Sequence, residues 1–145
     1  YPGEAGRMQH EEVGGVHFYN DAYNANPASA KAGFETMAEI KTSARKILIF
    51  ADMLELGVQS IESHIKAASQ MLMAGFDYII LFGEAVSSSA NYLKEQGFTS
   101  LFYSKDKSQS LQHFLNEVKQ GDLVYLKGSR GMQLEDYVNA YKENN

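Results

Sequence analysis

The chain has no cysteine among its 145 residues, so it can form neither a disulfide nor a cysteine-ligated metal site. It also lacks a cluster of basic residues, because 13 lysines and arginines are outnumbered by 18 acids and the net charge is -5. Nucleic acid and anionic membranes are therefore unfavourable partners. No apolar run approaches the roughly 20 residues that span a bilayer, and we see no signal-peptide pattern. These absences fit a protein of the reducing cytoplasm.

Two chemical signatures are also missing. No Gly-x-x-x-x-Gly-Lys-[Ser/Thr] phosphate-binding loop occurs in the chain. The histidines His10, His17 and His113 do not have the spacing of metal ligands. We therefore expect no metal site and no catalytic residue that acts within this chain alone.

The composition that remains is that of an ordinary globular protein, with 44% hydrophobic and 21% charged residues. Its length fits one domain spanning residues 1–145, which is large enough to bury a core. The first residue is Tyr1 rather than methionine, and we expect the chain to be a piece of a longer protein.

Short apolar runs alternate with amphipathic segments. We expect strands at 16–19, 47–50, 78–82 and 123–126, with weaker candidates at 7–10 and 101–103. We expect five helices between and after these strands. One begins at Pro27 and another spans 85–95. The apolar stripes of the first helix and of three others lie at 30, 34, 37 and 38; at 61, 65, 68 and 72; at 111, 114, 115 and 118; and at 134, 138 and 141. This alternation predicts an α/β fold, doubly wound, with a mostly parallel Rossmann-like sheet of about six strands and helices on both faces. Lys31–Glu35 and Glu62–Lys66 are expected to pair along two helices.

Three polar loops follow expected strands. They are 20–27 (Asn-Asp-Ala-Tyr-Asn-Ala-Asn-Pro), 51–57 (Ala-Asp-Met-Leu-Glu-Leu-Gly) and 127–132 (Lys-Gly-Ser-Arg-Gly-Met). Asn26 can cap a helix whose first residue is Pro27, so the first loop also reads as a plain strand-to-helix turn. Ligands of open parallel sheets bind at the carboxyl ends of strands, where all three loops are expected to lie.

Individual side chains of the first two loops allow more than one role. Asp21 can accept hydrogen bonds from a pair of ribose hydroxyls or shape the turn. Tyr23 can stack on a base or cover the edge of the core. Asp52 can orient a neighbouring loop or approach a nucleotide. His64 lies on the following expected helix, where a lone histidine is more often a surface or capping residue than a functional one.

The third loop combines two cations, Lys127 and Arg130, with the hydroxyl of Ser129. We expect Gly128 and Gly131 to make this loop flexible. Such a loop suits a carboxylate or a phosphate, although a basic turn facing solvent has the same composition.

These loops resemble the C-terminal domain of the Mur ligase family. The resemblance rests on Asp21–Pro27, Asp52–Gly57 and Leu126–Met132, and the opening Gly6-Arg7-Met8-Gln9 is similar to the segment that enters that domain. Two of these motifs, Asn-Ala-Asn-Pro and Lys-Gly-Ser-Arg-Gly, resemble the corresponding motifs of the family member that adds D-alanyl-D-alanine. Ala51 departs from the glycine that the family usually has before Asp-Met-Leu.

The resemblance implies part of an ATP-dependent ligase that joins UDP-N-acetylmuramoyl-tripeptide to D-alanyl-D-alanine for cell-wall synthesis in the bacterial cytoplasm. ATP and Mg²⁺ would be held mainly by a central domain that this chain lacks, as it lacks the UDP-binding domain. The chain would close over its missing domains, be monomeric, and be inactive alone. The implied nucleotide contacts are Arg7, Asp21, Tyr23, Asn24 and Asn26, and the implied substrate contacts are Lys127, Ser129 and Arg130.

Two other functions remain open at this point. A phospho-acceptor receiver domain needs acids and a lysine at strand ends, which Asp21, Asp52 and Lys127 supply. However, receivers usually have two acids after the first strand and a proline after the lysine, whereas Asp21 is alone and Gly128 follows Lys127. Another Mur-type ligase, of the folate or cyanophycin type, would share the fold and differ in substrate.

Overall fold

A computed structural model describes residues 8–145 of the chain. Within them, six strands form one sheet in the order β1-β2-β6-β3-β4-β5, in which β1 is antiparallel to β2 and the other pairs are parallel. The strands are β1 (Gln9–Val13), β2 (Val16–Asp21), β3 (Lys46–Ala51), β4 (Tyr78–Phe82), β5 (Leu101–Ser104) and β6 (Leu123–Lys127). The helices are α1 (Pro27–Glu39), η1 (Gly57–Gln59), α2 (Ser60–Ala74), α3 (Ser87–Glu95), α4 (Lys107–Glu117), η2 (Arg130–Met132) and α5 (Glu135–Glu143).

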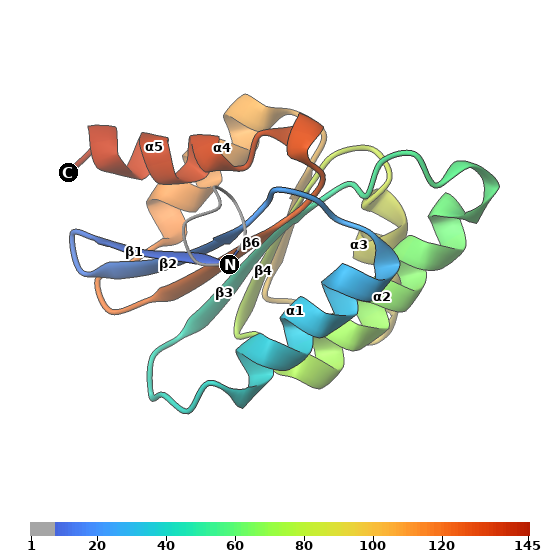
Figure 1. The fold of residues 1–145 in the computed structure, drawn as a ribbon, viewed down its shortest axis with the longest axis horizontal. Coiled ribbons are helices and arrows are strands. Elements are labelled where there is room, and N and C mark those ends of the chain that lie inside the picture. Colours follow the sequence, from blue (N-terminus) through green and yellow to red (C-terminus); the bar gives the residue numbers. More distant parts are fainter. Residues whose placement is uncertain (1–7) are drawn as a thin grey trace.

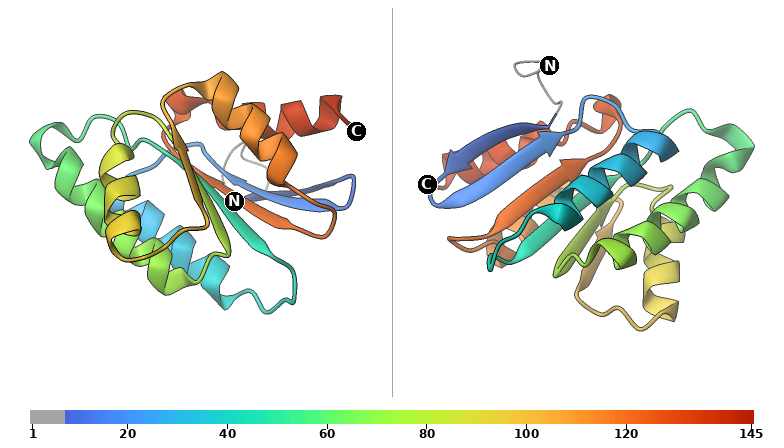
Figure 2. Two further views of the ribbon diagram at one scale, coloured as in Figure 1. Left: turned by 180° about the vertical axis from the view of Figure 1, so that it is seen from behind. Right: turned by 60° about the horizontal axis from the view of Figure 1, so that its bottom comes forward.

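Helices cover both faces of the sheet (Figures 1 and 2). α1, α2 and α3 share one buried apolar cluster, which includes Phe34, Met71 and Leu93. α4 and α5 pack on the opposite face around Phe114 and Tyr137. The central strands β3 and β6 are almost wholly buried, as their continuous apolar sequences predict. The doubly wound α/β fold is confirmed.

The element boundaries agree with the sequence except at the first strand. The four main strands and the helix at Pro27 are confirmed to within two residues. The weak candidate at 7–10 is instead β1, which continues to Val13 because the chain reverses at Gly14 and Gly15. Both glycines have positive φ, the conformation that glycine tolerates best. No helix within residues 8–145 is long and apolar enough to cross a membrane.

The apolar stripe of α2 differs from the prediction. Ile61 and Ile65 are exposed, at 66% and 37% of their surface. The buried side of the helix consists of His64, Ala67, Ala68 and Met71. Apolar periodicity missed this face because a histidine with internal hydrogen-bond partners belongs to it.

Candidate functional site

Three neighbouring strands bring the polar loops together. β6 lies between β2 and β3, and all three are parallel, so their carboxyl ends meet at one edge of the sheet (Figure 1). The register pairs Asp21 of β2 with Lys127 of β6, and Lys127 with Phe50 of β3. We call the loops 20–27, 51–57 and 127–132 at this edge the rim. The strand pattern predicted this meeting of loops.

Asp21 and Lys127 form an ion pair at the ends of their strands. Lys127 Nζ donates to Asp21 Oδ2 at 3.2 Å, and the Tyr125 hydroxyl donates to the same oxygen at 2.6 Å. The side chains of Lys127 and Asp21 are only 4% and 13% exposed. The cation therefore faces a carboxylate of its own chain rather than solvent. Removing either partner of a pair this buried leaves an uncompensated charge, so the pair fixes β2 against β6.

α1 approaches this pair closely at Gly33. A Cβ on Gly33 would overlap the Tyr125 hydroxyl and would lie 3.3 Å from Asp21 Oδ2. Glycine inside a helix costs roughly 0.5–1 kcal/mol relative to alanine, so its presence here reflects the lack of space. The sequence reasoning missed Gly33 and Tyr125, and an interior helical glycine was the available signal.

The first loop is held by its helix cap. Asn26 accepts a hydrogen bond from the Ser29 amide at 2.9 Å, and the Ser29 hydroxyl accepts one from the Asn26 amide at 3.1 Å. Pro27 occupies the first helical position, so the predicted cap is confirmed. Asn24 is exposed and has no hydrogen bond to another described residue. Asn24 therefore presents its whole side-chain amide to solvent.

Tyr23 and Arg130 form the exposed part of the rim. The Arg130 guanidinium carbon lies 5.1 Å from the centroid of the Tyr23 ring, a cation–π distance. Tyr23 is 36% exposed, and the Arg130 side chain has no hydrogen bond or ion pair with any residue between 8 and 145. The guanidinium donors of Arg130 thus face solvent. Arg7, the other arginine expected near the nucleotide, lies outside the described residues.

The third loop is packed rather than flexible at its first glycine. A Cβ on Gly128 would lie 2.9 Å from the Ala51 methyl and 3.0 Å from Leu134 Cδ1. Gly128 is buried, so the expectation that it loosens the loop is wrong. Ala51, the departure from the family pattern, fills space that Gly128 leaves open.

Ser129 joins the third loop to the second. Its amide donates to the Asp52 carbonyl at 3.1 Å, and its hydroxyl accepts from the Leu54 amide at 2.8 Å. The residue is 7% exposed. Its hydroxyl therefore fixes the relative position of two loops.

The Asp52 carboxylate holds a fourth loop, between β4 and α3. It accepts hydrogen bonds from the amides of Glu84 at 3.1 Å and Val86 at 2.9 Å, and the residue is 7% exposed. Gly83 has a φ of +128°, and a Cβ there would overlap the carboxylate. Burial, then the Asp52 charge, raises the pKa of Tyr103, whose hydroxyl donates to the Gly83 carbonyl. Of the two roles expected for Asp52, the geometry shows the orientation of a loop.

His64 holds the second loop from inside α2. Its Nε2 accepts from the Met53 amide at 3.0 Å, and its Nδ1 donates to the Ser60 carbonyl at 2.7 Å. This arrangement requires the neutral ring with its proton on Nδ1. The residue is fully buried, and the Ser89 hydroxyl donates to its carbonyl. Both ring nitrogens of His64 are therefore engaged within the protein.

The remaining histidines also pair with protein groups. His10 Nε2 and His17 Nδ1 are 3.1 Å apart across β1 and β2, and His113 Nε2 lies 2.7 Å from the Tyr78 hydroxyl. In the described part of the chain, no group of three or more His, Cys, Asp or Glu residues is placed to hold a metal ion.

The receiver-domain alternative does not fit this geometry. A phospho-acceptor carboxylate must be open to the metal and the phosphoryl donor. The Asp52 carboxylate is buried and accepts two backbone hydrogen bonds instead.

The fold and the three rim loops define a known class of domain. The family model for the Mur ligase, glutamate ligase domain, matches residues 6–130. The chain therefore belongs to the Mur ligase family.

Within that family it is similar to UDP-N-acetylmuramoyl-tripeptide–D-alanyl-D-alanine ligases. It is 31% identical to the Bacillus subtilis (strain 168) enzyme over 86% of this chain and 27% of that protein. It is 29% identical to the Escherichia coli (strain K12) enzyme over 86% of this chain and 26% of that protein. The chain thus spans about a quarter of the length of these curated relatives.

Solved structures show the same fold. MurF ligase from Thermotoga maritima in complex with ADP aligns with a TM-score of 0.80 and 22% identity, covering 99% of this chain and 32% of that one. MurF from Acinetobacter baumannii aligns with a TM-score of 0.83 and 24% identity, covering 97% of this chain and 30% of that one.

Proposed function

We propose that the chain is the C-terminal domain of an ATP-dependent ligase that adds D-alanyl-D-alanine to UDP-N-acetylmuramoyl-tripeptide in the bacterial cytoplasm. The observation that carries this proposal is the similarity to relatives named for that reaction, at 25–31% identity over 81–96% of this chain. Other Mur ligases share the fold at only 12–14% identity, with TM-scores of 0.60–0.68. Sequence similarity thus favours this ligase over those other Mur ligases.

The exposed side chains of the rim contact the substrates in this proposal. Tyr23 and Asn24, with the free oxygen of Asp21, face the nucleotide. Arg130 grips the carboxylate of the incoming dipeptide with two parallel hydrogen bonds, which its planar guanidinium suits. Because Arg130 lies over the Tyr23 ring, one exposed pair would serve both substrates.

In this proposal, the buried side chains of the rim do not contact the substrates but hold the rim loops in place. Lys127 holds Asp21 in place, Ser129 joins the second and third loops, and Asn26 caps α1. The same role is assigned to Asp52 and His64, whose polar side-chain atoms are engaged with the protein.

The cofactors divide between this chain and the rest of the ligase. The rim offers an aromatic ring, an exposed amide and a partly exposed carboxylate, a set that fits the base and ribose of ATP. ATP supplies the phosphoryl group that activates the tripeptide carboxylate. Residues 8–145 offer no cluster that fits Mg²⁺, so we derive no step through the metal in this chain. We place the phosphates and Mg²⁺ in a central domain, and expect the isolated chain to be monomeric and inactive.

The reaction is tested with the full-length protein. Purified enzyme is incubated with ATP, Mg²⁺, UDP-N-acetylmuramoyl-tripeptide and D-alanyl-D-alanine, and products are identified by mass spectrometry. We expect an amide-linked pentapeptide product together with ADP. Parallel reactions offer glutamate or diaminopimelate in place of the dipeptide. A product formed with one of these, and none with D-alanyl-D-alanine, would refute the proposed substrate.

The role of Arg130 is tested with the same enzyme. Arg130→Ala should raise the KM for D-alanyl-D-alanine by roughly tenfold or more and leave the KM for ATP nearly unchanged. Arg130→Lys keeps the positive charge but cannot form two parallel hydrogen bonds, so its KM for D-alanyl-D-alanine should lie between the values of wild type and Arg130→Ala. For the amidated dipeptide, which has no free carboxylate, the KM values of wild type and Arg130→Ala should be nearly equal. If both proteins prefer the free acid equally, the carboxylate is bound elsewhere.

A further inference from the structure

A concave site lies along the seam between α1 and α2, and it meets the rim only at Pro27. It is a cavity of about 420 Å³, within the roughly 300–1,000 Å³ of small-molecule sites. A smaller cavity of about 140 Å³ adjoins it and extends to Pro27 at the start of α1. Lys31, Lys66 and Gln70 line both cavities, so the two form one groove. We call it the α1–α2 groove.

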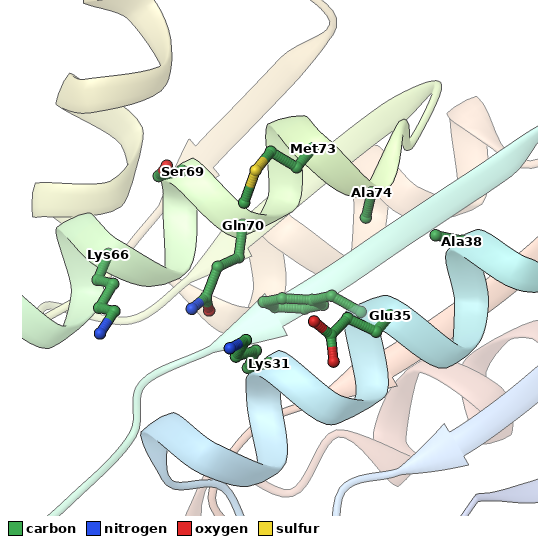
Figure 3. Close-up of a pocket in the computed structure, with 9 residues that line it drawn as sticks. Lys31, Glu35, Ala38, Lys66, Ser69, Gln70, Met73 and Ala74 are labelled. Carbon is green, nitrogen blue, oxygen red and sulfur yellow. The ribbon is translucent and has the colours of Figure 1, made fainter.

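The larger cavity is mainly apolar. Phe34 from α1 is 1% exposed and lines it. Ala38 from α1 and Met73 and Ala74 from α2 complete the apolar lining, and Met73 is 78% exposed (Figure 3). A thioether side chain adapts readily to the shape of a neighbouring apolar group. This end of the groove can take a short hydrocarbon chain.

Two lysines line the groove where the cavities join. Lys31 comes from α1 and Lys66 from α2, and the Gln70 side chain lies between them in Figure 3. The expected pairs Lys31–Glu35 and Glu62–Lys66 do not form, because neither lysine has a carboxylate of residues 8–145 within 4 Å. Glu35 is the one acid in the described lining, so the local charge is positive in a chain of net charge -5.

We propose that the α1–α2 groove binds a small amphipathic anion. The apolar chain of the ligand lies over Phe34 between Ala38 and Met73, and its phosphate or carboxylate head lies between Lys31 and Lys66. Two cations suffice for one small head group, whereas the net negative charge opposes an extended anionic partner such as a membrane surface. The proposal does not depend on the proposed ligase function, because the groove shares no residue with the exposed pair Tyr23 and Arg130.

The probe for this site is n-hexyl phosphate, titrated into the 145-residue chain and followed by amide chemical shifts. We expect saturable shifts at Phe34, Ala38 and Met73, and none at Tyr23 or Arg130. Inorganic phosphate and 1-hexanol, which carry one half of the probe each, should bind at least about tenfold more weakly. Equal binding of inorganic phosphate, or shifts confined to the rim, would overturn the proposal.

Variants separate the two halves of the groove. Lys31→Gln combined with Lys66→Gln should weaken hexyl phosphate binding roughly tenfold or more, whereas Lys94→Gln, on the exposed surface of α3, should leave it unchanged. Ala38→Trp should block the apolar half and abolish binding, and its exposed position lets the variant fold. Unchanged affinity in the double lysine variant would contradict the proposed head-group site. Preferential binding to anionic phospholipid vesicles over hexyl phosphate would contradict the choice of a small soluble ligand.

Discussion

The two ends of the sheet each carry an arginine, and the two arginines are held very differently. At the amino end, Arg45 donates to both carboxylate oxygens of Asp122 at 3.2 and 2.8 Å, and to the carboxylate and carbonyl of Glu117 at 2.6 and 2.8 Å. The Asp122 hydrogen bond, against an opposing effect of burial, raises the pKa of Arg45. At the carboxyl end, the Tyr23 ring is the one interaction partner that Arg130 has within residues 8–145.

The difference shows which cation is available to a ligand. The donors of Arg45 are satisfied by the chain itself, so Arg45 belongs to the architecture. The donors of Arg130 face solvent, so a substrate can use them. The same distinction divides the rim, where Lys127 is buried against Asp21 while Arg130 is exposed. Residue type alone does not separate these cases, whereas the partners of each side chain do.

The largest expected effect is at the most crowded point of the carboxyl end. Gly83→Ala should destabilise the chain by roughly 3–5 kcal/mol, because its methyl group would overlap the Asp52 carboxylate at a positive φ. Gly97→Ala is the matched control, since Gly97 also has a positive φ of 84° but no atom within 4 Å of the added Cβ. The control should cost only about 1–2 kcal/mol of backbone strain. Urea unfolding measures both, and equal losses would show that crowding around Asp52 is unimportant.

The buried ion pair of the rim should give the next largest effect. Lys127→Met should lower the free energy of unfolding by about 2–4 kcal/mol, because it leaves the Asp21 carboxylate poorly exposed and without its cation. Asp21→Asn should cost a similar amount by stranding Lys127. The double variant should cost clearly less than the two single effects added together. Strict additivity would mean that the two charges do not interact and that Lys127 is free for a ligand.

Much of this arrangement could be predicted from the sequence, because it follows local patterns. Apolar runs such as 47–50 identified the strands, and Asn26 before Pro27 identified the helix cap. Because the carboxyl ends of parallel strands lie at one edge of a sheet, the strand pattern also predicted that the three rim loops meet.

The partners of the rim side chains could not be predicted in the same way. Tyr125 is 104 residues from Asp21, and Asp52 bonds to amides 32 and 34 residues away. Local patterns do not contain such pairings. For that reason the sequence predicted Gly128 as flexible and could not tell a satisfied lysine at 127 from an available arginine at 130.

The smallest effects on stability should come from a matched substitution at the two ends. Arg45→Met should lower the free energy of unfolding by roughly 1–3 kcal/mol, because it leaves the largely buried Asp122 without its cation. This figure lies below that for Lys127 because the Arg45 side chain is 30% exposed. Arg130→Met should change it by less than about 1 kcal/mol, because Arg130 is exposed and the one contact it would lose among the described residues is the cation–π contact with Tyr23.

In the proposed full-length ligase, the order of the two arginines should reverse when substrate binding is measured instead of stability. Arg130→Met should raise the KM for D-alanyl-D-alanine by roughly tenfold or more, while Arg45→Met should leave it unchanged once the enzyme is shown to be folded. Because Arg45 and Arg130 lie at opposite ends of the sheet, the losses of unfolding free energy caused by Arg45→Met and Arg130→Met should add in the variant that carries both substitutions. A loss of stability in Arg130→Met as large as that in Arg45→Met would mean that Arg130 has structural partners. Its exposed position would then no longer mark it as a substrate contact.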